Sequence, residues 1–196
     1  HELYNSGVYE DSNRRDGVGF LVHKKHKDAV IGFTGVSERV AMLKLRGRYN
    51  NTVIIQCYAP STSHSDEEVE QFYTVIQDLI DTKVPKRDIL LVNGDFNAKI
   101  GGLHTTAPDI VGPYSNVKRG NNERGVLLVD FCKQNNLIIS NTQFKHRRQW
   151  TWMSPGDRTR NSINFVLIRH TAKKHITDTH VISTPDISDH RLERCK

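Results

Sequence analysis

The chain has 196 residues, of which 36% are hydrophobic and 26% are charged; this composition excludes a disordered or disulfide-built protein and suits one globular domain. No stretch approaches the ~20 apolar residues that cross a membrane, so we expect no membrane partner. The formal net charge of +6 favours polyanionic partners, above all nucleic acid.

Strand patterns come first along the chain. Residues 17 to 23 predict a buried strand, and residues 39 to 45 alternate their apolar side chains with a period of two. The run at 52 to 58 is rich in β-branched residues and follows Asn50-Asn51. We therefore expect it to form a hairpin with the strand at 39 to 45.

An amphipathic helix is predicted between these strands and Pro85. Ser65 followed by Glu68 is a capping-box pattern, which marks the start of a helix. Apolar residues then recur at spacings of three, four and seven, which gives one apolar face. They are Val69, Phe72, Val75, Ile76, Leu79 and Ile80.

The second half repeats this mixture of strands and helix. A strand at 88 to 92 is followed by a long loop over residues 101 to 121, and a helix is expected from Asn122 to Asn135. Further strands are expected at 137 to 140, 149 to 153, 162 to 168 and 179 to 183. Isolated helices between strands and a hairpin favour an α/β (α+β) sandwich over a strict βαβ repeat.

The stretch Asn93-Gly94-Asp95-Phe96-Asn97 places an acid and an amide where a buried strand ends. If the strand continues through Phe96, Asp95 and Asn97 leave the same face at the edge where α/β sheets hold reactive groups. Gly, Asn and Asp are also common turn formers, so a plain turn is the alternative interpretation.

Polar side chains mark the ends of other predicted strands as well. Phosphodiester hydrolysis needs a base for water, donors to the phosphate oxygens, and a cation for the developing charge. The candidates, which supply a base and donors, are Tyr58, Asp95, Asn97, Asn164, Asp189 and His190.

In their order along the chain, these motifs resemble the endonuclease/exonuclease/phosphatase family. The matching stretches are residues 17 to 22, 57 to 60, 94 to 98, 150 to 152, 162 to 167 and 188 to 190. The segment from Thr151 to Asn161 resembles the endonuclease domain of RTE-type non-LTR retrotransposons.

This resemblance implies a four-layer α/β sandwich with two mixed sheets covered by helices, formed by residues 1 to 196 as one domain. It also implies DNA cleavage with Mg²⁺ or Mn²⁺ by a nuclear protein, which we expect to be a monomer. In that scheme Asp95 would orient or deprotonate water, Asn97 and Tyr58 would hold the phosphate, Asp189 would help to bind the metal, and His190 would stabilise the transition-state oxyanion.

Basic pairs and clusters indicate a surface for DNA. They include Arg14-Arg15, Lys24-Lys25, Lys118-Arg119, residues 145 to 148, Arg158 with Arg160, and Lys173-Lys174. The residues expected to contact nucleic acid are Arg147, Arg148, Trp152, Arg158 and Arg160. We expect most of the ten histidines to lie at the surface.

Two departures from the family predict an impaired enzyme. The opening strand and the strand with a Gln-Glu motif, whose glutamate is the principal metal ligand of the family, have no counterpart here, so we expect a domain truncated at its N-terminus. Residues 191 to 196 end without a turn signal, so we expect truncation at the C-terminus as well. The family usually has Ile-Asp-Tyr where this chain has Ile163-Asn164-Phe165. The amide of Asn164 can accept a hydrogen bond from His190 but adds no negative charge to favour the imidazolium.

Two other functions remain open from the sequence. The domain could be a decayed relative that binds nucleic acid without turnover, since its basic residues serve binding equally well. It could also be a lipid or inositol phosphodiesterase of the same fold. The retroelement-like phrase around Trp152 disfavours this second alternative.

Overall fold

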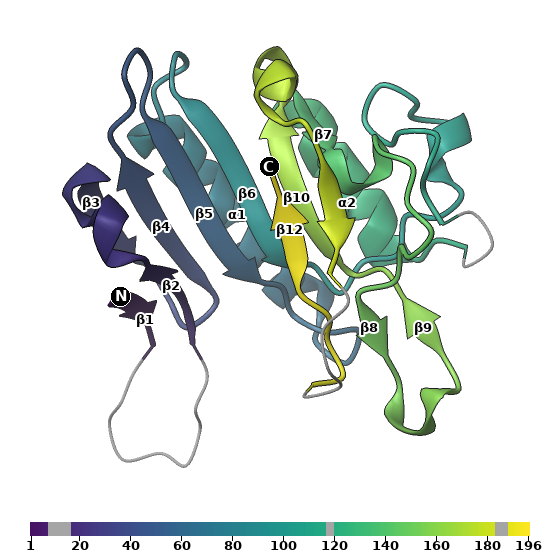
Figure 1. Ribbon diagram of the computed structural model, residues 1–196. Coiled ribbons are helices and arrows are strands. Elements are labelled where there is room, and N and C mark those ends of the chain that lie inside the picture. Colours follow the sequence, from purple (N-terminus) through teal and green to yellow (C-terminus); the bar gives the residue numbers. More distant parts are fainter. Residues whose placement is uncertain (8–16, 117–119, 183–187) are drawn as a thin grey trace. The chain divides into compact units, whose positions relative to one another are not determined.

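The computed structural model describes residues 1–7, 17–116, 120–182 and 188–196 (Figure 1). The chain divides into two compact units, His1–Gly94 and Asp95–Lys196, and each is described by itself. The expectation of a single domain over residues 1 to 196 therefore stays a prediction.

Strands dominate the first unit. β1 (Glu2–Ser6) pairs with β2 (Val18–Val22) in antiparallel register, and η1 (Lys24–Ala29) follows. A larger sheet takes the order β3 (Val30–Gly35), β4 (Val40–Leu45), β5 (Thr52–Tyr58) and β6 (Ile89–Asp95). β1 and β3 were not predicted, because β1 is largely polar and glycines interrupt the apolar pattern of β3.

The predicted hairpin is confirmed. β4 and β5 pair antiparallel with Val40 opposite Cys57 and Leu45 opposite Thr52. Val53, Ile55 and Cys57 are buried while the residues between them are partly exposed, so β5 has one face in the core.

The predicted helix is α1 (Asp66–Lys83), and its capping box is present. The Ser65 hydroxyl accepts a hydrogen bond from the Glu68 N–H at 3.3 Å, and the Glu68 carboxylate accepts one from the Ser65 N–H at 2.9 Å. The predicted apolar residues are buried except Val75, which is partly exposed. Figure 1 shows α1 behind the strands of its own unit.

The second unit has one long helix and one longer strand pair. α2 (Glu123–Gln134) begins at Asn122, whose side chain accepts a hydrogen bond from the Gly125 N–H at 2.9 Å. β7 (Leu137–Ile139) pairs antiparallel with β10 (Asn164–Arg169). Leu128 and Cys132 of α2 are fully buried, as are most residues of both strands, which places the core of this unit between them.

Two short ribbons complete the second unit. β8 (Trp152–Met153) pairs with β9 (Arg160–Asn161), and β11 (Thr179–Val181) pairs with β12 (Glu193–Cys195). The predicted strands at 149 to 153 and 179 to 183 are shorter than expected, and Ser183 lies outside the described residues. The short 3-10 turns are η2 (Leu103–Thr105), η4 (Ser140–Thr142), η5 (Pro155–Asp157) and η6 (His170–His175).

The α/β class is confirmed by these elements. The predicted loop over residues 101 to 121 is irregular apart from η2 and short turns, with residues 117–119 outside the described part. In the part of the chain that the structure describes, no helix combines the length and apolar character needed to cross a membrane.

Candidate active site

The chain turns sharply at the end of β6. The Asn97 N–H donates to Asp95 Oδ1 at 2.9 Å, and Asn97 has a φ of 49°, a left-handed conformation that Asn tolerates. The expectation that Asp95 and Asn97 share a face of a continuing strand is wrong, because β6 stops at Asp95. The turn occupies one carboxylate oxygen of Asp95 and leaves the other to face the site.

Gly94 makes this turn possible. Its φ is +149°, and a Cβ at this position would lie 1.8 Å from the carbonyl oxygen of Cys57. Only glycine fits such a close backbone approach without displacing the chain. The close approach of β5 and β6 therefore explains why a glycine precedes Asp95 in the motif.

His190 lies between a carboxylate and an amide. Its Nε2 is 3.8 Å from Asp95 Oδ2, and its Nδ1 is 3.1 Å from Asn164 Oδ1. Asn164 is the first residue of β10, and its backbone is held by the buried Thr151 hydroxyl, which accepts from the Ile163 and Asn164 N–H groups at 3.0 Å each. The structure thus brings together Asp95, Asn164 and His190 as the sequence predicts.

Asp189 is fixed by the β8 segment. Its Oδ2 accepts a hydrogen bond from Trp152 Nε1 at 3.0 Å, and its backbone oxygen accepts one from the Met153 N–H at 2.9 Å. Trp152 also forms a β-bridge with His190. The indole of Trp152 therefore positions the carboxylate of Asp189, a role that the sequence did not suggest. A contact of Trp152 with nucleic acid stays a prediction.

The pKa values of Asp95 and Asp189 are shifted in opposite directions. Burial raises the pKa of Asp95, against the lowering effect of the Asn97 hydrogen bond and the His190 charge, and the Asp189 charge raises it further. Partial desolvation works to raise the pKa of Asp189, but the Trp152 hydrogen bond and the His190 charge outweigh it and lower this pKa. Such a divided pair is typical of sites that handle protons.

Asp95 and Asp189 are the two carboxylates of the candidate site that can contribute oxygen ligands to a metal ion. The two groups lie close enough for the charge of one to shift the pKa of the other. In phosphoryl-transfer sites Mg²⁺ is usually held by one or two carboxylates, with water and substrate phosphate as the other ligands. These two carboxylates supply part of such a ligand set, and the glutamate that the family adds to it has no counterpart in this chain.

Tyr58 lies at the end of β5 in the first unit. Its side chain is 44% exposed, and the Arg39 guanidinium lies 5.4 Å from its ring centroid. An exposed phenol at a strand end is available to donate a hydrogen bond. Its joint action with Asp95 stays a prediction.

Basic side chains gather around Trp150. The guanidinium carbons of Arg148, Arg160 and Arg191 lie 5.6, 4.7 and 4.9 Å from its ring. We call these four residues the Trp150 cluster. Two of its arginines were predicted to contact nucleic acid, whereas Arg191 was missed although it directly follows His190.

The other predicted basic residues are scattered. Arg147 and Arg158 are exposed. The pairs Arg14-Arg15 and Lys118-Arg119 lie outside the described residues. The Trp150 cluster is therefore the best-defined basic feature beside the predicted site.

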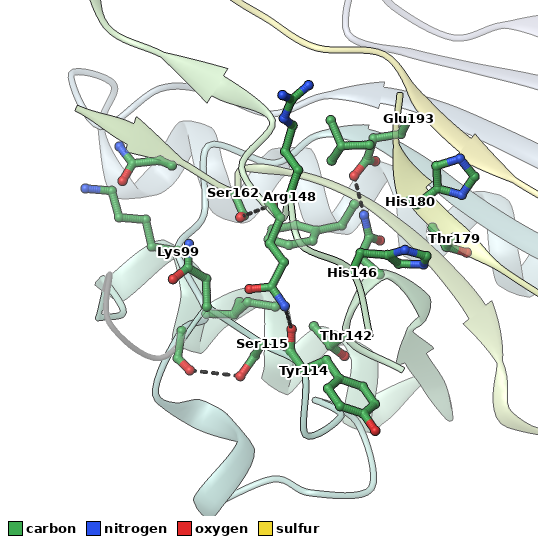
Figure 2. A pocket seen from close by; sticks show the side chains of 18 of the residues that line it. Lys99, Tyr114, Ser115, Thr142, His146, Arg148, Ser162, Thr179, His180 and Glu193 are labelled. Atoms are coloured by element: carbon green, nitrogen blue, oxygen red, sulfur yellow. Dashed lines mark hydrogen bonds between the residues drawn. The ribbon is translucent and has the colours of Figure 1, made fainter. Parts of the chain in front are cut away.

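Figure 2 shows a separate cavity in the second unit, with a volume of about 40 Å³. Lys99, Arg148, His146, His180 and Glu193 are among the residues that line it. The candidate catalytic and metal-binding residues Asp95, Asn97, Asn164, Asp189 and His190 are not. A space of this size holds a few water molecules.

Comparisons with known proteins agree with the motifs. No protein-family model matches the chain. It is 35% identical to craniofacial development protein 2 from Tragulus javanicus over 98% of its length, and 34% identical to the Bos taurus protein over the same share. The chain spans about a third of the length of these curated relatives, 33% and 32% respectively.

Solved structures show the same fold. The endonuclease domain of TRAS1, a telomere-specific non-LTR retrotransposon, has a TM-score of 0.63 and 14% identity, covering 97% of this chain and 75% of that one. The 3'-5' exonuclease NExo of Neisseria meningitidis has a TM-score of 0.61 and 16% identity, with 82% and 65% covered. The Xenopus laevis APE2 catalytic domain has a TM-score of 0.57 and 17% identity, with 83% and 57% covered.

Proposed function

We propose that this chain, which has the fold of the endonuclease/exonuclease/phosphatase family, is a metal-dependent DNA endonuclease domain derived from a non-LTR retrotransposon. The similarity to craniofacial development protein 2 and to the TRAS1 endonuclease domain supports this origin. DNA as substrate, a monomeric state and a nuclear location are parts of the same proposal.

The observation that carries the proposal is the placement of His190 between Asp95 and Asn164. An ionised Asp95 orients water and accepts its proton, and the raised pKa of this group strengthens it as a base. His190, held at Nδ1 by Asn164, directs Nε2 toward the same place and donates to a phosphate oxygen when protonated. Asn97 and Tyr58 would add neutral donors to the phosphate.

Asp189, together with Asp95, would hold Mg²⁺ or Mn²⁺. When bound, the ion supplies positive charge for the oxygens that become more negative during hydrolysis. Trp152 keeps Asp189 oriented for this ligand role through its 3.0 Å hydrogen bond. The low proton affinity of Asp189 suits a group that must stay ionised near neutral pH.

Asn164 lowers the expected rate. An aspartate at this position would place a negative charge 3.1 Å from the His190 ring and favour the imidazolium, whereas the amide of Asn164 is neutral. In serine proteases the corresponding change from acid to amide reduces the rate by ~10⁴. We therefore propose an enzyme that is impaired relative to family members with the acid.

The Trp150 cluster favours a second function. Three guanidinium groups beside one indole make a site for the DNA backbone that does not depend on His190 or Asp95. A decayed domain that binds nucleic acid without cleaving it would keep this cluster. It would show salt-sensitive binding to duplex DNA, weakened by Arg160→Ala and unchanged by His190→Ala.

The test is nicking of supercoiled plasmid by the purified chain with Mg²⁺. The endonuclease proposal predicts slow nicking that EDTA stops and that Asp95→Ala removes. Asp130→Asn, a substitution of an exposed aspartate on α2, is the matched control and should nick at the unchanged rate. Nicking that survives Asp95→Ala would refute the assignment, and DNA binding without any nicking would favour the second function.

A further inference from the structure

The second unit has another cluster of metal-binding groups, formed by His146, Asp178 and His180. Asp178 Oδ1 is 2.7 Å from His146 Nε2, and Asp178 Oδ2 is 2.7 Å from His180 Nδ1. The two imidazole rings are 5.2 Å apart between centroids and tilted by 44°. We call these residues the His146 cluster. It shares no residue with the candidate active site.

The backbone of the C-terminal ribbon fixes two members of the cluster. Asp178 and His180 are two residues apart around β11, so their side chains project from one face of the strand. β11 pairs with β12, and the Lys196 N–H donates to the Asp178 carbonyl oxygen at 2.9 Å. Between them Thr179 is buried and lies 3.0 Å from the Ser140 hydroxyl. The carboxylate and the imidazole are therefore presented by a well-anchored segment.

We propose that the His146 cluster binds one divalent transition-metal ion, with Zn²⁺ as the preferred ion. Two imidazole nitrogens and one carboxylate oxygen are the ligand types of zinc sites that keep a further position for water. Mg²⁺ prefers oxygen ligands and would not select this set. The proposal does not depend on the proposed nuclease function.

The distances permit binding after a small adjustment. All three ligand atoms lie within 4.8 Å of one another. In a tetrahedral zinc site the ligand atoms are ~3.3 Å apart, given bonds of about 2.0 Å. The two contacts of 2.7 Å must therefore open by about half an ångström, and the imidazole nitrogens must approach each other. We expect rotations of the three side chains to make this adjustment.

The surroundings also suit an ion. The side chains are 31%, 24% and 24% exposed for His146, Asp178 and His180, so an ion can enter while losing part of its contact with solvent. Figure 2 shows His146 and His180 near each other at the edge of the cavity. Within the described residues, this is the one group of three or more His, Cys, Asp or Glu side chains with ligand atoms so close together.

An ion at this place would link two distant parts of the second unit. His146 is 32 residues from Asp178 in sequence, and it precedes the segment with Trp150 and Trp152. The ribbon with His180 continues through β12, which follows Asp189 and His190. Binding of Zn²⁺ would therefore stabilise the folded unit on both sides of the candidate active site.

The experiment is calorimetric titration of the whole chain with Zn²⁺. We expect one ion per chain, with binding at least 10-fold weaker in His146→Ala and in His180→Ala. The matched controls His170→Ala and His175→Ala remove exposed histidines of η6 and should bind as the unchanged chain does. Cys195→Ser should also keep the affinity and exclude the exposed thiol as the ligand.

Folding of each variant is checked by circular dichroism, and Asp178→Asn supplies a substitution of equal shape. It should also weaken zinc binding at least 10-fold. Asp95→Ala should retain the site, which separates it from any metal at the candidate active site. The proposal is overturned if folded His146→Ala and His180→Ala bind Zn²⁺ unchanged, if the control histidines weaken binding equally, or if no ion binds.

Discussion

The second unit contains two places where histidine meets aspartate, and they differ in how completely the carboxylate is bonded. Asp178 has a 2.7 Å contact with an imidazole on each of its oxygens. Asp95 gives one oxygen to a backbone N–H and is 3.8 Å from His190 with the other, while the imidazole is held by the neutral Asn164. Both oxygens of Asp178 are therefore in contact with imidazoles, whereas the 3.8 Å separation of Asp95 Oδ2 from His190 leaves room for a reactant.

Proton affinity follows this difference. Desolvation works to raise the pKa of Asp178, but hydrogen bonds from His146 and His180 lower it overall. Burial dominates at Asp95 and raises its pKa. Glu193 shows the largest effect: desolvation raises its pKa to about 8, and the hydrogen bond from the Asn141 amide offsets only part of this rise. The balance between desolvation and the groups that donate to the carboxylate decides the direction of each pKa shift.

The largest expected effect is the loss of nicking in His190→Ala, which is compared with His180→Ala at the other histidine site. His190→Ala should reduce plasmid nicking by ~10²–10⁴, because it removes the donor to the phosphate. His180→Ala should change the nicking rate in Mg²⁺ by no more than about twofold. The loss of a catalytic group would lower this rate by at least ~10². Both rates are measured with equal amounts of folded protein. Equal losses in the two variants would show that the clusters do not differ in function.

Glu193→Gln tests whether desolvation keeps the Glu193 side chain protonated in the folded state. Because the pKa is about 8 in the folded state and 4.5 in a free side chain, the folded chain holds a proton that the unfolded chain releases. Stability should therefore fall as pH rises from 4.5 to 8 and level off above that. The substitution should remove this fall, with a gain at pH 9 of at most about 5 kcal/mol, the free-energy equivalent of the difference between the two pKa values.

Urea unfolding at pH 5 and pH 9 measures this effect. Glu70→Gln, at an exposed position on α1, is the control and should keep the pH dependence of the original chain. If Glu193→Gln and the original chain lose stability equally between these pH values, Glu193 is ionised in the folded state.

Asn164→Asp would make the candidate active site more like the His146 cluster, because a carboxylate would then contact the imidazole of His190. A carboxylate 3.1 Å from His190 Nδ1 favours the imidazolium and holds the ring more firmly. Nicking should increase about 10-fold, well below the ~10⁴ seen for the reverse change in serine proteases. Asn164→Ala should lower the rate, and an unchanged rate in both variants would show that Asn164 does not limit catalysis.

The fold could be predicted where local pattern and tertiary environment agree. α1 has both a capping box and a continuous apolar face, so its start at Asp66 and its buried side were clear from sequence. β1 carries few apolar residues, and β8 and β9 are only two residues long. Their pairing depends on partners elsewhere in the chain, which no local pattern reveals.

Prediction of the functional sites from sequence likewise succeeded only where a local motif marked the residues. Asp95, Asn164 and His190 could be selected because each belongs to a motif at a strand end, and the structure brings them together. The His146 cluster was missed because His146 stood within a basic run and His180 within polar surroundings. The signal that sequence does hold is the pair Asp178 and His180, two residues apart at the start of the strand expected from residue 179.

Trp152→Phe should have the smallest effect and would test what keeps Asp189 oriented. Phenylalanine retains an aromatic ring but removes the N–H that donates to Asp189 Oδ2 at 3.0 Å. Without this bond the carboxylate becomes more basic and less fixed, so half-maximal nicking should need about threefold more Mg²⁺, equivalent to a net hydrogen bond of roughly 0.7 kcal/mol. Trp150→Phe is the matched control, since it alters the ring beneath three arginines and should weaken DNA binding at an unchanged Mg²⁺ requirement. If both variants change only DNA binding, Trp152 contacts the substrate and Asp189 is positioned by its backbone alone.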